Sequence, residues 1–210
     1  MTVIAVDGPA ASGKGTIARA LAGHFGLPFM DTGLLYRAVA LNLWRWGGDP
    51  GNEFEALRAC NELNLDADDP ELRSEPVSKI ASSVSAYPGV RAALLERQQS
   101  FARQVAGAVL DGRDIGTVIA PDADVKLFVT ATAEVRAERR KRELEARGMH
   151  ATYNDVLADI RSRDERDSHR EVAPLVPAKD AILLDTSNLG VEEAIAEAIR
   201  LTEQRLKSRA

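Results

Sequence analysis

The chain has few of the residues on which several classes of protein depend. Its one cysteine, Cys60, excludes an internal disulfide and fits a reducing cytoplasm, and we interpret it as a small core residue. No apolar run is long enough to cross a membrane, and no secretory leader is visible, so we expect no membrane partner. The few histidines lack metal-ligand spacing, which argues against a zinc site. They are His24, His150 and His169.

Positive charge is also in short supply. The chain has 27 Lys and Arg residues against 32 Asp and Glu residues, a net charge of −5. General nucleic-acid binding depends on an excess of positive charge, so we expect no nucleic-acid partner. A composition of 45% hydrophobic and 28% charged residues is typical of a globular protein. A length of 210 residues is enough for one well-buried core, so we expect a single domain over 1–210 and a monomer.

A glycine-rich loop that ends in Gly-Lys lies near the start of the chain. The apolar run Val3–Val6 before it predicts a buried strand, and the periodic residues after it predict a helix that ends at Gly26. Glycines let backbone N–H groups turn around an anion, the helix start adds partial positive charge, and Lys14 adds a full charge. We therefore predict a loop that binds the phosphates of ATP. Its residues are Gly8, Pro9, Ala10, Ala11, Ser12, Gly13, Lys14, Gly15 and Thr16.

The loop departs from the usual phosphate-loop pattern at one position. Gly15 stands where the pattern has Ser or Thr, and the hydroxyl follows one residue later, at Thr16. This shift weakens the case for direct Mg²⁺ ligation by a side chain here. The alternative is that the segment is merely a turn, which is uncommon for a Gly-Lys loop between a strand and a helix.

Further short apolar runs alternate with helical patterns along the chain. The runs are 27–30, 106–110, 126–129 and 181–184, and the clearest helical patterns are 36–46 and 191–206. This alternation predicts an α/β fold in which helices cover a parallel sheet. Ligands of such sheets bind at the carboxyl ends of strands, where Asp31, Asp111 and the phosphate loop fall.

Three segments fit that core poorly. The acidic, proline-containing stretch at about 64–80 predicts a solvated excursion, and the charge-dense stretch at about 148–177 predicts a mobile lid. The Arg- and Glu-rich run from Glu134 to Arg147 is typical of a solvated helix with many ion pairs, and we assign it no function.

Polar residues follow two of the predicted strands. After the second strand, Thr32 is placed to cap a helix, and Arg37 could bind a second phosphate-bearing substrate. The equally open alternative is a cap, a half-buried Tyr36 and a surface arginine. After a later strand, Asp111 could hold Mg²⁺, through water, and we expect Arg113 to point into the same site. The competing interpretation is a structural Asp–Arg ion pair.

The predicted lid carries a cluster of arginines. Arg163, Arg166, Asp167 and Arg170 have spacings that place them on one helical face. They could close over a polyphosphate and offset charge in a transition state. They could equally form ordinary exposed ion pairs, which contribute only about 0.3–0.5 kcal/mol each.

Taken together, these segments resemble the bacterial cytidylate kinase family. The resemblance spans nearly the whole chain, and two of its segments, 111–118 and 163–175, are quite specific to the family. The remaining matching segments are Asp7–Thr16, Asp31–Gly33 with Tyr36 and Arg37, and Tyr87–Leu95.

The resemblance implies transfer of the γ-phosphoryl group of ATP to CMP or dCMP with Mg²⁺. It implies a P-loop kinase fold with a five-stranded parallel sheet flanked by helices, a lid and a monophosphate-binding excursion, which is short in this chain. The implied catalytic residues are Lys14, Arg113, Arg163, Arg166 and Arg170. The implied CMP-binding residues are Thr32, Tyr36, Arg37, Ser82, Arg91, Arg113, Asp114, Arg163 and Asp167. The metal candidates are Thr16 and Asp111. Long members of the family carry a small sheet before the position of Ser82, and here the stretch is too short and acidic to form one.

Two rival functions remain at this point. One is a P-loop kinase for another small acceptor, such as adenylate or a sugar-like acid, which would not need the cytosine-reading residues. The other is a GTP-dependent switch. The chain lacks the [NT]-K-x-D guanine signature of such switches, and an arginine-rich lid has no purpose in one.

Overall fold

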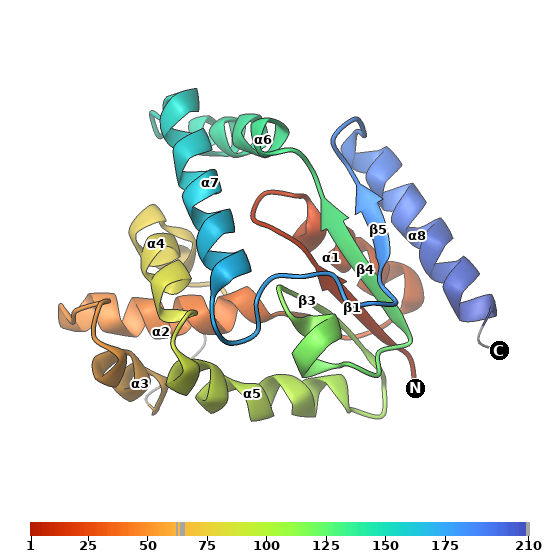
Figure 1. The fold of residues 1–210 in the computed structure, drawn as a ribbon, viewed down its shortest axis with the longest axis horizontal. Coiled ribbons are helices and arrows are strands. Elements are labelled where there is room, and N and C mark those ends of the chain that lie inside the picture. The colour runs from red at the N-terminus through yellow and green to blue at the C-terminus, as the bar shows by residue number, and fades with distance from the viewer. Residues whose placement is uncertain (62, 64–65, 209–210) are drawn as a thin grey trace. The chain divides into compact units, whose positions relative to one another are not determined.

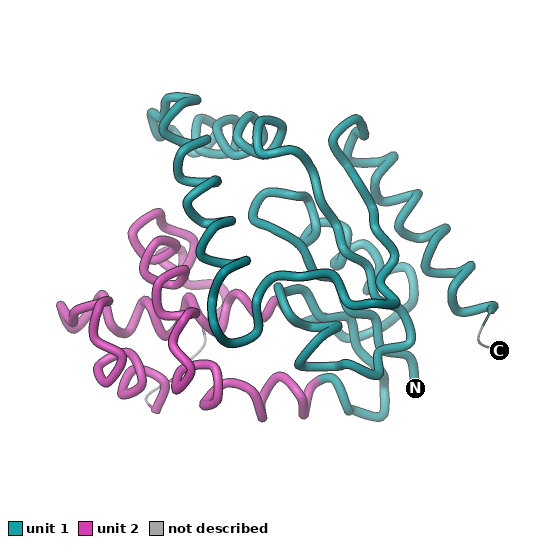
Figure 2. The backbone as a smooth tube through the Cα atoms, viewed as in Figure 1, with its two compact units in different colours: residues 1–30, 102–210 teal, residues 31–101 magenta. Residues whose placement is uncertain are grey.

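The computed structural model describes residues 1–61, 63 and 66–208, and these form two compact units. Unit 1 comprises Met1–Met30 and the chain from Ala102 onward, and unit 2 comprises Asp31–Phe101 (Figure 2). Unit 2 is thus an insertion into the sequence of unit 1. Residues 64 and 65 of the predicted excursion lie outside the described residues.

Unit 1 contains the predicted α/β core. Its elements in chain order are β1 (Val3–Asp7), α1 (Lys14–Phe25), β2 (Phe29–Asp31, whose last residue belongs to unit 2), β3 (Ala108–Gly112), the π-helical turn η2 (Ile115–Ile119), β4 (Val125–Thr130), α6 (Ala133–Ala146), α7 (Tyr153–His169), β5 (Ile182–Asp185) and α8 (Val191–Lys207) (Figure 1).

The strands of the described chain form one five-stranded sheet in the order β2-β3-β1-β4-β5. Strand β1 pairs in parallel with both β3 and β4, and β4 pairs in parallel with β5. The register places Val6 of β1 opposite Asp111 of β3. The phosphate loop follows β1, so Asp111 reaches the same sheet edge as that loop, as predicted.

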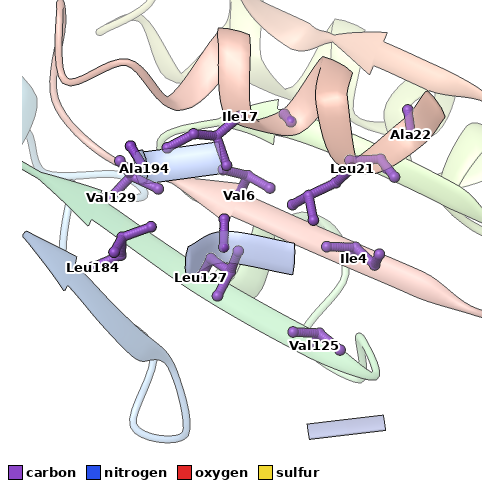
Figure 3. Close-up of a cluster of buried hydrophobic side chains, with 13 residues drawn as sticks. Ile4, Val6, Ile17, Leu21, Ala22, Val125, Leu127, Val129, Leu184 and Ala194 are labelled. Atoms are coloured by element: carbon purple, nitrogen blue, oxygen red, sulfur yellow. The ribbon is translucent and has the colours of Figure 1, made fainter. Parts of the chain in front are cut away.

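The main core of unit 1 lies between the sheet and the two helices α1 and α8 (Figure 3). Alternate strand residues such as Ile4 and Val6 point into it, because side chains in a strand alternate between the two faces. Helix α1 contributes Ile17 and Leu21 at helical spacing, and α8 contributes Ala194. Full burial of each large aliphatic side chain stabilises the fold by about 1.5–3 kcal/mol. The predicted apolar face of α1 and its end at Gly26, in the left-handed conformation, are confirmed.

Helices α6 and α7 form a second cluster in unit 1. Ala137 and Leu144 of α6 pack with Val156 and Ile160 of α7, and Ala11 of the phosphate loop packs against the same cluster. Thr132 and Thr152 cap the two helices through their side-chain oxygens. The predicted lid, 148–177, therefore contains one long helix that packs on α6.

Unit 2 is helical. It contains α2 (Thr32–Trp46), α3 (Glu53–Asn61), the 3₁₀ turn η1 (Pro70–Arg73), α4 (Glu75–Val84) and all of α5 (Pro88–Ala102) but its last residue. Helix α2 packs against α3 and α4. In the described part of the excursion, 66–80, there is no strand, as the short sequence predicted. Its acidic residues Asp69 and Glu71 instead pair with Arg45 of α2.

One local prediction in unit 2 is wrong. Thr32 was expected to cap the helix after β2, but Asp31 occupies the N-cap position and Thr32 is the buried first residue of α2. The Asp31 side chain makes no capping hydrogen bond there.

Within the described ranges, no helix has both the length and the apolar character that a bilayer span requires.

The close approach of Gly8 to β4 generates a stability prediction. A Cβ atom at Gly8 would lie 2.0 Å from the backbone oxygen of Val129, and that oxygen cannot move without displacing the strand. We expect Gly8→Ala to lower the free energy of unfolding by roughly 3 kcal/mol or more, as overpacking of rigid backbone does.

Gly23 provides the matched control. It lies exposed within α1, and its Cβ would meet nothing within 4 Å. We expect Gly23→Ala to raise the free energy of unfolding by about 0.5–1 kcal/mol, because alanine loses less conformational entropy than glycine in a helix. Urea unfolding of both variants tests the pair. Equal stability of Gly8→Ala and the parent would contradict the close approach.

Candidate active site

The phosphate loop is built by backbone conformations that few residues adopt. Gly13 (φ 90°) and Ala11 (φ 58°) both have positive φ, and α1 begins at Lys14 directly after the loop. Successive N–H groups in such a turn and at a helix start form a cradle for an anion. The Lys14 ammonium lies 3.4 Å from a carboxylate oxygen of Asp111. Lys14 and Asp111 therefore lie together at one edge of the sheet, as the strand pattern predicted.

The carbonyl groups of the loop are held from outside by other elements of unit 1. Arg136 of α6 donates from Nη1 to the Ala10 oxygen at 3.3 Å, and the Thr186 hydroxyl, just after β5, donates to the Ser12 oxygen at 3.0 Å. Arg139 of α6 donates to the Thr186 hydroxyl at 2.9 Å. The loop is therefore supported by two segments that follow it by more than a hundred residues.

These contacts correct the interpretation of the segment Glu134–Arg147. Most of it is the expected solvated helix, with exposed pairs such as Lys141 with Glu145 and Arg142 with Glu138. Arg136, however, is buried and contacts the phosphate loop. The available signal was its helical spacing from Ala133 and Leu144, which are apolar residues on the same face.

A fully buried carboxylate, Asp7, joins β1 to the loop after β3. Its two oxygens accept the backbone N–H groups of Ile115 and Gly116, each at 2.8 Å. Burial raises the pKa of Asp7 to about 7, and the charges of Asp114 and Asp111 add to this, although the two N–H donors oppose it. Asp7 thus fixes the π-helical turn directly after Arg113 and Asp114. Sequence reasoning gave Asp7 no role.

The buried carboxylate of Asp167 holds two of the predicted arginines together. Arg113 donates from Nε to Asp167 Oδ2 at 2.9 Å, and Arg163 Nε lies 4.0 Å from the same oxygen. Burial alone would raise the pKa of Asp167, but the positive charges of Arg113 and Arg163 outweigh it and leave that pKa below its ordinary value. Asp167 is therefore ionised at neutral pH. The sequence also left open a structural Asp–Arg ion pair in this region. The structure contains such a pair, and the partner of Arg113 in it is Asp167.

The other two arginines of the predicted lid, Arg170 and Arg166, differ in their surroundings. Arg170 lies just beyond the end of α7, where its guanidinium Nη2 is 3.8 Å from Asp114 and its Nε donates to the Ala173 oxygen at 2.5 Å. Arg166 is exposed on α7 and donates to the Ser162 hydroxyl at 2.8 Å. The contacts thus bring Arg113, Arg163 and Arg170 to two buried carboxylates, whereas Arg166 faces solvent.

Unit 2 gathers a second set of the predicted residues. The Arg91 guanidinium of α5 lies 5.6 Å from the ring centre of Tyr36 on α2, within the range of a cation–π contact. Arg91 also donates to the Ser85 oxygen, and the Ser85 hydroxyl donates to the Ser82 oxygen. Tyr36, Ser82 and Arg91 are all buried. They form a polar and aromatic cluster inside unit 2.

Arg37 is directed at the excursion within unit 2. Its Nη1 donates to the Leu72 oxygen at 3.1 Å and to the Ser78 hydroxyl at 2.6 Å. Ser78, buried at the start of α4, was not singled out from the sequence. These bonds fix the Arg37 side chain, so the open alternative of a surface charge is wrong for this residue.

The donor set near Lys14 fits a divalent cation that is held mainly by phosphates. Asp111 offers a hard oxygen ligand, and a Cβ at Gly15 would approach its Oδ2 to 2.9 Å, so a side chain at position 15 would crowd that oxygen. Thr16 is exposed on the first turn of α1. Across the part of the chain that is described, no group of three or more His, Cys, Asp or Glu side chains could form a cage for a metal. One carboxylate with substrate phosphates is a usual arrangement for Mg²⁺.

Comparison with known proteins places this geometry in a family. The model of the family described as "Cytidylate kinase" matches residues 4–204. This chain belongs to the cytidylate kinase family. It is 57% identical over 203 residues to a cytidylate kinase of Azorhizobium caulinodans, covering 96% of this chain and 98% of the relative. It is also 57% identical over 208 residues to a cytidylate kinase of Xanthobacter autotrophicus, covering 99% and 100%.

Solved structures support the fold. A gluconokinase from Sinorhizobium meliloti aligns with a TM-score of 0.54 at 17% identity, covering 99% of this chain and 95% of that one. An uncharacterised protein from Eubacterium ventriosum aligns with a TM-score of 0.55 at 13% identity, covering 97% and 99%. At such identities the likeness shows the fold alone.

The raised pKa of Asp7 predicts a pH-dependent contribution to stability. The native state binds the Asp7 proton more tightly than the unfolded state, whose carboxyl has a pKa near 3.8. The contribution is therefore fully present below about pH 4 and is lost as the pH rises through about 7, by an amount on the order of a few kcal/mol.

Asp7→Asn, which does not titrate, serves as the reference in this test. The free energy of unfolding of the parent minus that of Asp7→Asn should fall between pH 4.5 and pH 8, as urea titrations can measure. The neighbouring Asp111, Asp114 and Lys14 are present in both proteins. A difference that stays constant with pH would show that Asp7 titrates normally.

Proposed function

We propose that this chain transfers the γ-phosphoryl group of ATP to CMP or dCMP and releases CDP or dCDP. The observation that carries the proposal is the convergence, in unit 1, of the phosphate loop, Lys14 and Asp111 with three arginines around Asp114 and Asp167. Membership of the cytidylate kinase family supports the choice of acceptor. The family also supports ATP as the donor.

The chemistry requires two polyanions to be aligned and their charge to be offset. In the proposed mechanism the loop from Gly8 to Thr16 holds the phosphates of ATP through its backbone N–H groups, and Lys14 offsets charge on the outer phosphates. Arg113, Arg163 and Arg170 reach the transferring group and the acceptor phosphate. Their guanidinium groups are already held by Asp167 and Asp114, so they need little reorganisation when charge develops.

The transfer is proposed to be direct and in line. The donor set consists of cations and backbone N–H groups, which position and stabilise a phosphoryl group without forming a bond to it. Arg166 is also proposed as a catalytic residue. Because it is exposed in this structure, that role requires its side chain to move toward the phosphates. Exclusion of water during the reaction prevents hydrolysis of ATP.

Recognition of CMP is proposed to use the residues that the family resemblance implies. Asp114 would accept from the cytosine amino group, and Arg91 and Ser82 would donate to the ring. Arg37, Arg113 and Arg163 would bind the acceptor phosphate. Asp167 would contact the sugar together with Arg163. Thr32 and Tyr36 would line the acceptor site.

Mg²⁺ is proposed as the cofactor, held by Asp111 through water and by the Thr16 hydroxyl together with the ATP phosphates. When bound, it neutralises charge on the β- and γ-phosphates. The proposed organisation is a single P-loop kinase domain over 1–210, with an excursion at about 64–80 and a lid at about 148–177. The proposed form is a cytoplasmic monomer whose partners are small molecules only.

A screen of acceptors tests the function. We expect a coupled assay with ATP and Mg²⁺ to give turnover with CMP and dCMP well above that with UMP, AMP or gluconate. Gluconate is included because the fold is shared with a gluconokinase. Turnover that is highest with AMP or gluconate would leave the phosphate-loop kinase standing but remove the cytidylate assignment. Slow hydrolysis of GTP with no acceptor would favour a switch.

The role of Lys14 gives a second prediction for the active protein. We expect Lys14→Ala to lower kcat on the order of 10²-fold or more, the usual effect of losing one preorganised donor to the transition state. Lys141→Ala is the control, because Lys141 forms an ion pair with Glu145 on α6 and has no contact with the phosphate loop among its described bonds. Unchanged kcat for Lys14→Ala at saturating ATP would remove Lys14 from the mechanism.

A further inference from the structure

Arg136 lies in a charge-rich helix, but its contacts are those of a buried structural residue. It is buried, and its guanidinium donates to four acceptors. Nε donates to the Ala131 oxygen at 2.9 Å, and Nη1 donates to the Ala10 oxygen at 3.3 Å. Nη1 and Nη2 also donate to the two carboxylate oxygens of Asp164, at 2.9 and 2.6 Å. A fork of this kind fixes the guanidinium plane as well as its position.

The bond to Ala10 controls the direction of a donor in the phosphate loop. In a trans peptide the C=O of one residue and the N–H of the next point in opposite directions. All peptide bonds of the described chain are trans. By holding the Ala10 carbonyl from outside, Arg136 therefore directs the Ala11 N–H away from α6 and toward the other side of the loop. Ala11 is itself in the left-handed region, at φ 58°, which a residue with a Cβ adopts only when its surroundings hold it there.

The same part of the loop packs against the two helices that carry the pair. Ala11 contacts the apolar cluster of α6 and α7. Asp164 lies on α7, directly after Arg163 and three residues before Asp167. The pair thus spans α6 and α7 and ends on the loop, so the carboxylate of Asp164 acts on the loop through Arg136.

We propose that Arg136 and Asp164 are a positioning pair that holds the phosphate loop in its ATP-binding conformation. This inference rests on the proposed function, because it assigns ATP to that loop. Neither residue needs to touch ATP for this role. The loss of either one should weaken ATP binding and leave CMP binding nearly unchanged.

The experiment measures ATP and CMP binding separately by calorimetry, and KM for each in the coupled assay. We expect Asp164→Asn to raise the Kd and KM for ATP about tenfold, because a charge-assisted hydrogen bond becomes a neutral one. The values for CMP should stay within about twofold of the parent. Asp164→Glu, which keeps the charge, should recover part of the ATP affinity.

A second ion pair between the same helices provides the matched control. Arg161 of α7 pairs with Glu134 of α6 at 2.9 Å, but both side chains are more than half exposed, and their bond does not involve the loop. Glu134→Gln removes a carboxylate from an α6–α7 pair in the same way, and it should leave ATP affinity unchanged. Arg136→Lys keeps the charge but cannot serve the carbonyls and both carboxylate oxygens together, so it should resemble Asp164→Asn. It also replaces that variant if Asp164→Asn does not fold.

The outcomes separate this inference from the proposed function. If the parent protein binds ATP and phosphorylates CMP but Asp164→Asn and Arg136→Lys bind ATP normally, the positioning pair is wrong and the function stands. A parallel loss of ATP and CMP affinity with lowered thermal stability would show a merely structural role and would also overturn the pair. If the parent itself binds no ATP, the proposed function fails and the inference fails with it.

Discussion

The phosphate loop can offer its N–H groups to an anion only if its carbonyl groups, which point the other way, have donors of their own. An unsatisfied buried carbonyl costs about 1–3 kcal/mol, so the loop conformation depends on those donors. Here they come from Arg136 for Ala10 and from Thr186 for Ser12. The order of the strands, which places β4 beside β1 and β5 beside β4, brings the segments after β4 and β5 to the loop. The sheet, α6 and α7 can be understood as the support that this one loop needs.

A second constraint is the number of buried carboxylates around the loop in unit 1. Asp7, Asp111, Asp114 and Asp167 are all nearly inaccessible, and each lies near a cation or backbone N–H donors. The cations that the proposed mechanism uses are therefore held in place before any phosphate arrives. Because Asp167 faces two arginines, its pKa lies below the ordinary value. Asp7 is fully buried, has no cation among its hydrogen-bond partners and lies near the charges of Asp114 and Asp111, so its pKa is raised to about 7. The same residue type thus serves two roles, according to its neighbours.

The fold and the acceptor preference have separate origins in this chain. A gluconokinase shares the fold at 17% identity, so the sheet and the loop do not by themselves select an acceptor. The residues proposed to read cytosine come from α4, α5 and the segment after β3, and Tyr36 with Arg91 already forms an ordered contact inside unit 2. The family-specific segments of the sequence, rather than the architecture, therefore carry the substrate assignment.

The sequence by itself determined the elements whose signals are local. Val3–Val6 before a Gly-Lys loop predicted β1, the loop and α1, and the alternation of strands and helices predicted that Asp111 would meet Lys14, because parallel strands end at one edge. Spacing along one helix likewise predicted the approach of Arg163 to Asp167. The tertiary structure decided the partners of the buried Arg136. Its helical spacing from Ala133 and Leu144 is a local signal for the buried face of α6, but it does not say what that face contacts. The hydrogen-bond partners of Arg136, Asp164 and Ala10, lie 28 and 126 residues away from it in the sequence. The N–H donors to Asp7 lie 108 and 109 residues away from it. Contacts over such separations are fixed by packing, which no local pattern of residues specifies.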